Sequence, residues 1–217
     1  MGIKKLIIIA TTITFVMTTL DAKVWNFEDV QIGKLPKGWT VDETHRSKKL
    51  PTWEVLEDKT APSKNHTLTL SHINSRTFFG GNFNLCFTKD VDFLDGEISV
   101  MFRANSGKTD QGGGIMWRVK DRDNYYVARF NPLEDNFRFY SVKKGVRSEL
   151  KSANIKLSQG WHKMTIVQKE KHFEGYLDGE KLLESDDDTF TKSGGVGLWT
   201  KADAATSFDD FNVTKSK

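Results

Sequence analysis

The sequence predicts an all-β domain, built as a sandwich of two antiparallel sheets. Apolar and polar residues alternate with a period of two along short runs, which is the pattern of a half-buried strand. Glycine and aspartate residues end these runs, as expected of turns. Aromatic residues make up 12% of the chain, which is too many for a disordered protein. Because each sheet hides one face, about a dozen short strands need two sheets packed together.

The predicted strands follow one another along the second half of the chain. The alternation predicts strands over residues 98–103, 115–119, 125–130, 137–140 and 164–167. Asp121–Asn124 predicts a hairpin turn. So does Asp178-Gly179, because this dipeptide tolerates the positive φ angles of a type I′ turn.

The two ends of the predicted domain resemble each other in sequence. Val24–Asp29 and Phe208–Val213 share a pattern of aromatic, acidic and asparagine residues, so we expect these segments to pair as neighbouring strands. Trp161 opens a predicted strand after Gly160 and is expected to anchor the packing between the sheets. Phe208 and Phe211 are expected to hold the closing strand.

The first 22 residues have the layout of a secretory signal peptide. Lys4 and Lys5 precede an apolar run over residues 6–20, and the small residue Ala22 precedes Lys23. The apolar run is shorter than the roughly 20 residues of a membrane-spanning helix. We therefore expect cleavage near Ala22 rather than an uncleaved anchor, no stable membrane anchor, and a single domain over residues 23–217. The expected location is periplasmic or secreted.

Composition excludes several classes of function. A formal net charge of +3 is too small for the clustered basic face of a nucleic-acid binder, so no nucleic-acid partner is expected. Cys86 is the single cysteine, which excludes an internal disulfide and any site with several cysteine ligands. Its position inside an apolar strand predicts a buried thiol.

Several motifs resemble known families. Gly160–His162, Gly175–Gly179 and Gly195–Trp199 resemble the laminin-G and concanavalin A-like series. Gly113–Ile115, Asp123–Tyr126, Arg129–Asn136 and Gly197–Asp203 resemble a bacterial family of 3-keto-disaccharide hydrolases. The resemblance extends from about Phe27 to Val213. It implies a concanavalin A-like jelly-roll sandwich of two antiparallel sheets, export, and action on oxidised glycosides.

The sequence shows no dedicated catalytic pair. Glycoside hydrolases of family 16 share the jelly roll and carry Glu-x-Asp-x-x-Glu on one strand, a spacing absent here. No two histidines have a metal-binding spacing, so no metal site and no cofactor are predicted. Calcium or another metal at the acidic turn Asp186–Asp188 stays an alternative to a solvated turn. His45 is the weak candidate for a catalytic acid or base at the edge of a groove.

Candidate sugar-binding residues lie on successive predicted strands. They are Arg103, Arg118, Tyr125, Arg129, Asn131, Arg138, Trp199, Lys201 and Asp203. Guanidinium groups donate hydrogen bonds in a fixed plane to hydroxyl or carboxylate groups, and aromatic rings cover the apolar face of a sugar. The competing interpretation is that these arginines pair with acidic residues on an exposed sheet.

Three classes of function follow. The first is a hydrolase or lyase of 3-keto or otherwise modified glycosides, acting in a groove on a concave sheet, as the resemblance implies. The second is a non-catalytic, lectin-like carbohydrate-binding module. The third, a purely structural envelope protein, is less favoured because of the polar and aromatic groove candidates. The expected partner is a carbohydrate or glycoside ligand.

Overall fold

The computed structural model describes residues 21–46, 49–73 and 82–216, which form fifteen strands and their connections. The expected signal peptide lies almost entirely outside these residues and stays a prediction. Within the described ranges the secondary structure is strand and turn, and no helix there is long and apolar enough to cross a membrane. The all-β prediction is confirmed.

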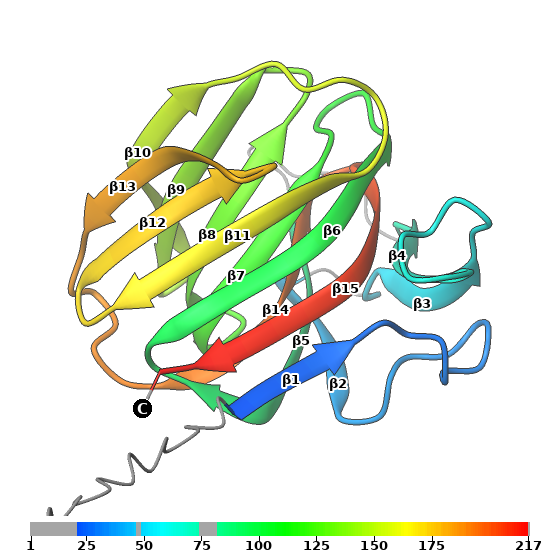
Figure 1. Cartoon of the computed structure of the whole chain (residues 1–217), viewed down its shortest axis with the longest axis horizontal. Helices are drawn as coiled ribbons and strands as arrows, with labels where there is room; N and C mark the ends of the chain where they lie inside the picture. The colour runs from blue at the N-terminus through cyan, green and yellow to red at the C-terminus, as the bar shows by residue number, and fades with distance from the viewer. Residues whose placement is uncertain (1–20, 47–48, 74–81, 217) are drawn as a thin grey trace, which may run out of the picture.

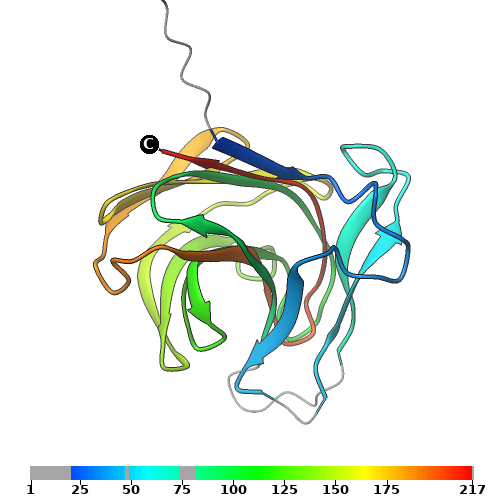
Figure 2. The ribbon, with the colours of Figure 1, turned by 90° about the horizontal axis from the view of Figure 1, so that it is seen from below.

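The strands form two antiparallel sheets that lie one above the other (Figures 1 and 2). The first sheet contains β1 (Asp21–Trp25), β3 (Thr52–Glu57), β4 (His66–His72), β6 (Gly96–Ser106), β11 (His162–Lys169), β12 (His172–Leu177), β13 (Glu180–Asp186) and β15 (Ala205–Lys215). The second contains β2 (Trp39–Thr44), β5 (Phe83–Phe93), β7 (Gly113–Asp121), β8 (Asn124–Asn131), β9 (Asn136–Lys143), β10 (Val146–Asn154) and β14 (Gly194–Lys201).

Strand order differs from chain order in both sheets. The first sheet runs β13-β12-β11-β6-β15-β4-β3, with β1 also paired to β15, and the second runs β10-β9-β8-β7-β14-β5-β2. The expected pairing of the chain ends is confirmed, since Val24 lies opposite Asn212 and Trp25 opposite Phe211. Phe208 and Phe211 are fully buried, as expected for the closing strand.

Both predicted hairpins form, at Asp121–Asn124 and at Asp178-Gly179. Asp121 pairs with Asn124 across the β7–β8 turn. Between β12 and β13, Asp178 and Gly179 have φ angles of 49° and 84°, the two positive values that a type I′ turn requires. The sequence therefore determines these two registers locally.

The core between the sheets is built from aromatic side chains. Trp117 is fully buried at its centre, with its ring 5.4 Å from Tyr126 and 5.6 Å from Phe173. Its indole Nε1 donates a hydrogen bond to Gln168 Oε1 at 2.7 Å, so the one polar atom of this side chain has a partner. Cys86 is also fully buried, as predicted, and burial raises the pKa of its thiol well above the usual value.

Trp161 does not anchor the core, and that prediction is wrong. Met164 and Ile166 point into the core, so the alternation of β11 turns Trp161 to the outer face of the first sheet. There it is half-buried, and its Nε1 donates a hydrogen bond to Thr60 Oγ1 at 3.1 Å. The guanidinium group of Arg103 lies 5.1 Å from the ring centroid.

Candidate functional site

A second apolar cluster lies on the face of the second sheet that is turned away from the core. This concave cluster contains Phe83, Leu85, Phe87, Met116, Val119, Tyr125, Val127, Tyr140, Val142 and Trp199. The sheet is strongly curved, and its concave face is turned away from the first sheet (Figure 2). Tyr125 Oη contacts Thr44 Oγ1 at 2.9 Å and accepts a hydrogen bond from Trp199 Nε1 at 3.2 Å. These contacts join β8, β14 and β2 across the concave face.

The curvature changes the role of two predicted sugar-binding residues. Tyr125 and Trp199 lie on the concave face, as the prediction requires, but both are fully buried. They pack the floor of this face instead of standing open to a ligand. Burial raises the pKa of the Tyr125 hydroxyl well above its usual range, despite its hydrogen bonds with Thr44 and Trp199.

A buried network of charged groups continues the concave face beyond the apolar cluster. Arg129, 1% exposed, donates hydrogen bonds to Asn136 Oδ1 at 3.1 Å and to Glu134 Oε2 at 3.2 Å. Lys201 Nζ lies 2.9 Å from Asp110 Oδ2, and Asn131 Nδ2 donates to Asp110 Oδ1 at 3.0 Å. Three predicted residues, Arg129, Asn131 and Lys201, are therefore brought together.

The network reaches solvent through Glu134, Arg138 and Glu149. Arg138 lies 3.4 Å from Glu134 Oε2 and 3.3 Å from Glu149 Oε2, and its side chain is 29% exposed. The pKa of Glu134 is lowered overall. Burial alone would raise it, but the hydrogen bond from Asn136 and the positive charges of Arg129, Arg138 and Lys201 together outweigh burial. Glu134 is thus ionised at neutral pH and is poorly suited to act as a general acid.

Arg147 on β10 lies over the aromatic rings at the edge of this network. Its guanidinium carbon is 4.3 Å from the ring centroid of Tyr140, 5.0 Å from that of Phe83 and 6.0 Å from that of Trp199. Its Nη1 atom is shielded from solvent and has no hydrogen-bond partner. Burial is the main cause that lowers the pKa of this guanidinium group.

His45 lies at the same edge. Its exposed imidazole ring is 5.5 Å from the ring of Phe83, which also contacts Arg147. A Cβ atom placed on Gly145, in the turn between β9 and β10, would lie 3.7 Å from His45 Nε2. The backbone of His45 is left-handed, with φ of 60°, an uncommon conformation for a residue other than glycine. The role of His45 as a catalytic acid or base at a groove edge stays a prediction.

Two hollows open on the surface near these elements. One of about 700 Å³ lies beside the concave face, lined by Asp42, Phe87, Lys89, residues 121–124 and Lys144. Another of about 720 Å³ lies at the end of the sandwich, where Arg103, Gln111 and residues 156–160 contribute to its wall. Lys144, in the wall of the first hollow, belongs to the β9–β10 turn. Gly145 of the same turn lies close to His45, and Arg147 follows it on β10.

Three predicted sugar-binding residues lie elsewhere and have structural partners, so for them the prediction is corrected. Arg103 belongs to the first sheet and pairs with Asp58 at 2.6 Å. Arg118, fully buried at an irregularity of β7, donates hydrogen bonds to three backbone carbonyl groups and to Asp95. Asp203 accepts hydrogen bonds from the backbone N–H groups of residues 108–110 and so fixes that loop.

Sequence reasoning missed Arg147 as a site residue. It follows the Lys144-Gly145 turn by two residues, but β10 has a largely exposed pattern without clear alternation. Asp110 was also missed, because it lies in a polar loop and is buried only by contacts with Asn131 and Lys201 from other strands. The one usable signal for Arg147 was its place two residues after Lys144-Gly145, a dipeptide whose glycine is typical of a turn.

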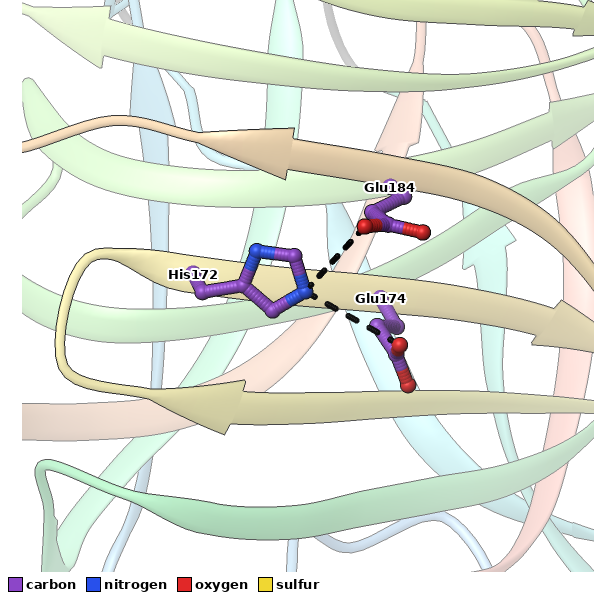
Figure 3. Close-up of side chains that lie close together, drawn as sticks. All are labelled: His172, Glu174 and Glu184. Atoms are coloured by element: carbon purple, nitrogen blue, oxygen red, sulfur yellow. Dashed lines mark ion pairs between the residues drawn. The ribbon is translucent and has the colours of Figure 1, made fainter.

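A cluster of metal-ligating groups lies on the outer face of the first sheet. Ligand atoms of His172, Glu174 and Glu184 lie within 4.8 Å of one another (Figure 3). Lys181 Nζ lies 3.0 Å from Glu174 Oε1 and 2.8 Å from Glu184 Oε2, so one ammonium group already pairs with both carboxylates and offsets part of their negative charge. At the acidic turn, Asp187 Oδ1 accepts hydrogen bonds from Tyr126 and Thr189. Calcium at Asp186–Asp188 stays an untested alternative to a solvated turn.

Comparison with known proteins gives similarity at the level of structure. No protein-family profile and no curated protein sequence matches the chain. The carbohydrate-binding module CBM66 from Bacillus subtilis has a TM-score of 0.61 at 18% identity, covering 81% of this chain and 95% of that one. This chain is a concanavalin A-like jelly roll.

Two further structures support this jelly-roll assignment. The exoplasmic/lumenal domain of VIP36, in a form bound to Ca²⁺ and mannose, has a TM-score of 0.57 at 11% identity and covers 91% of this chain and 92% of that one. The β-glucanase of Bacillus licheniformis has a TM-score of 0.55 at 10% identity, covering 90% of this chain and 98% of that one. At such identities the similarity establishes the fold, and function must be argued from the site.

Proposed function

We propose that this jelly roll is an exported, lectin-like domain that binds a saccharide at the solvent-facing edge of its concave sheet. The observation that carries the proposal is the group of Arg138, Tyr140, Arg147 and Glu149 on neighbouring strands β9 and β10, with His45 opposite. The guanidinium and carboxylate groups supply charged donors and acceptors for sugar hydroxyl groups, while the buried ring of Tyr140 forms the floor beneath them. The similar structures that carry a saccharide or act on one add support.

Binding is favoured over glycoside hydrolysis by the state of the nearby carboxyl groups. Hydrolysis by the usual route needs a protonated carboxyl group and a second carboxylate at a set distance. Asp110 pairs with Lys201, and Glu134 is shared by Arg129, Arg138 and Asn136, with a lowered pKa. These groups are organised as partners of cations rather than as an acid–base pair.

The proposal predicts a binding loss on one face of the molecule. Arg138→Ala removes a charged donor at the edge, where such a hydrogen bond is worth about 1.5–3 kcal/mol, so saccharide affinity should fall roughly tenfold or more. Arg103→Ala is the matched control, since Arg103 also makes an ion pair and is 27% exposed against 29% for Arg138. A glycan array followed by calorimetry measures both. Equal affinity of the two variants and the wild type would contradict the proposal.

A second candidate is the chemistry that the 3-keto-disaccharide hydrolase resemblance implies. The observation in its favour is the exposed imidazole of His45 beside the hollow, where it could remove a proton next to a 3-keto group. Release of free sugar from a 3-keto disaccharide, lost in His45→Ala and with ordinary disaccharides unreactive, is the expected result for this candidate. Binding of the substrate without turnover leaves the lectin-like function alone.

The export component of the proposal has its own test. Cleavage after Ala22 would leave Lys23, Val24 and Trp25 paired with β15. The mature protein should therefore begin at or near Lys23 in periplasmic or secreted material, as measured by intact mass. An intact Met1 in that material would contradict cleavage.

A further inference from the structure

Arg147 differs from every other described arginine in lacking an acidic partner. The others lie within 4.0 Å of a carboxylate oxygen: Arg46 with Asp42, Arg103 with Asp58, Arg118 with Asp95, Arg122 with Asp123, Arg129 with Glu134, and Arg138 with Glu149. Within residues 21–46, 49–73 and 82–216, Arg147 has neither an ion pair nor a hydrogen bond. The guanidinium group instead lies over the aromatic rings of Tyr140, Phe83 and Trp199.

The aromatic contacts stabilise the positive charge of Arg147 but give its N–H groups no hydrogen-bond acceptor. The rings of Tyr140, Phe83 and Trp199 attract the positive charge of the guanidinium group through their faces. The N–H groups point outward in the plane of the fork and need oxygen acceptors. A cation that is partly removed from water without a counter-charge is costly, and burial accordingly lowers the pKa of Arg147.

The nearby carboxylates are already used by other cations. Glu149 lies 3.3 Å from Arg138, Glu134 lies 3.2 Å from Arg129, and Asp110 lies 2.9 Å from Lys201. Arg147 is therefore the one positive charge on this part of the concave face without a carboxylate within 4.0 Å among the described residues. A neutral sugar would supply hydroxyl acceptors but no charge to balance it.

We infer that Arg147 binds an oxyanion carried by the saccharide, the carboxylate of a uronic acid or a sulfate ester. This inference rests on the proposed binding function and specifies its ligand class. The side of the guanidinium group away from the shielded Nη1, with the N–H groups of Nε and Nη2, matches two oxygen atoms of such a group at once, and the aromatic rings hold it in one plane. The neighbouring paired residues Arg138 and Glu149 then remain available for neutral hydroxyl groups.

Matched pairs of probes test the inference. Trigalacturonate is compared with its methyl ester, and 6-sulfated N-acetyllactosamine with the unsulfated sugar, by calorimetry at low and moderate salt. The wild type should bind one anionic member at least about tenfold more tightly than its neutral partner, as for a charged hydrogen bond. The pair that shows the preference identifies carboxylate or sulfate.

Variants of the arginine locate the preference. Arg147→Gln should bring the ratio between the affinities for the anionic and the neutral probe close to one, and Arg147→Lys should keep only part of that ratio because the fork is lost. Arg103→Gln, on the other sheet, should keep the full preference. Thermal unfolding shows which variants are folded. If Arg147→Gln is not folded, the lysine variant and the wild-type comparison of anionic with neutral probes test the inference.

The negative results distinguish a failure of the oxyanion inference from a failure of saccharide binding. Equal binding of neutral and anionic probes by the wild type overturns the oxyanion inference and leaves saccharide binding intact. If folded Arg147→Gln keeps the preference for the anionic probe, the assignment to Arg147 is wrong. If that variant does not fold, an undiminished preference in folded Arg147→Lys overturns the assignment. If no saccharide of any kind binds, the proposed function fails and the inference fails with it.

Discussion

Trp117→Ala should lower the free energy of unfolding by about 3–5 kcal/mol, the cost of removing a fully buried large aromatic side chain. Trp117 contacts Tyr126, Phe139 and Phe173, so its loss leaves a cavity among rings from three strands. It also leaves Gln168 Oε1 without its donor at 2.7 Å, which adds to the cost. Urea-induced unfolding followed by far-UV circular dichroism measures the change.

Trp161→Ala is the control for this prediction. Trp161 is half-buried on the outer face of the first sheet, so the same substitution should cost well under half as much. A loss at Trp161 as large as that at Trp117 would show that the assignment of inner and outer faces on β11 is wrong.

Arg129→Ala should destabilise the protein by about 1.5–3 kcal/mol, because it removes a fully buried guanidinium group that donates charged hydrogen bonds. The variant leaves Asn136 Oδ1 without its donor, and it removes a positive charge 3.2 Å from Glu134 and 4.0 Å from buried Asp110. Because Arg129 is buried in this network, its removal affects the fold as well as any bound ligand. Chemical denaturation at neutral pH measures the loss.

Arg138→Ala belongs to the same network and serves as the comparison. Its ion pairs with Glu134 and Glu149 lie at the surface, so its removal should cost no more than about 1 kcal/mol. If Arg129→Ala were no more destabilising than Arg138→Ala, the buried network would not contribute to stability in the way its geometry implies.

The sequence predicts the fold well because strand alternation and turn chemistry are local. The Asp178-Gly179 hairpin and the pairing of Val24 with Asn212 are both confirmed by the register of the sheets. The prediction fails where one residue interrupts the alternation. Arg118 has φ of 48° at an irregularity of β7, so Val119 joins the concave cluster while Trp117 stays in the core.

The site is less predictable because it depends on how the sheet curves. Alternation correctly places Tyr125 and Arg129 on one face of β8, but their partners come from other strands, Thr44 on β2 for Tyr125 and Asn136 on β9 for Arg129. The curvature of the sheet brings Arg147 over Phe83, a residue more than sixty positions away in the sequence. A contact of that range leaves no periodic signal in either strand.

The most direct test of saccharide binding at the concave edge is an NMR titration of backbone amides with the saccharide that binds best. Shift changes should concentrate on residues 138–149 and on His45, around the Arg147 guanidinium group. Changes confined to the hollow at Arg103, Gln111 and residues 156–162 would place the ligand at the end of the sandwich and contradict the account. So would an unchanged spectrum with every saccharide tested.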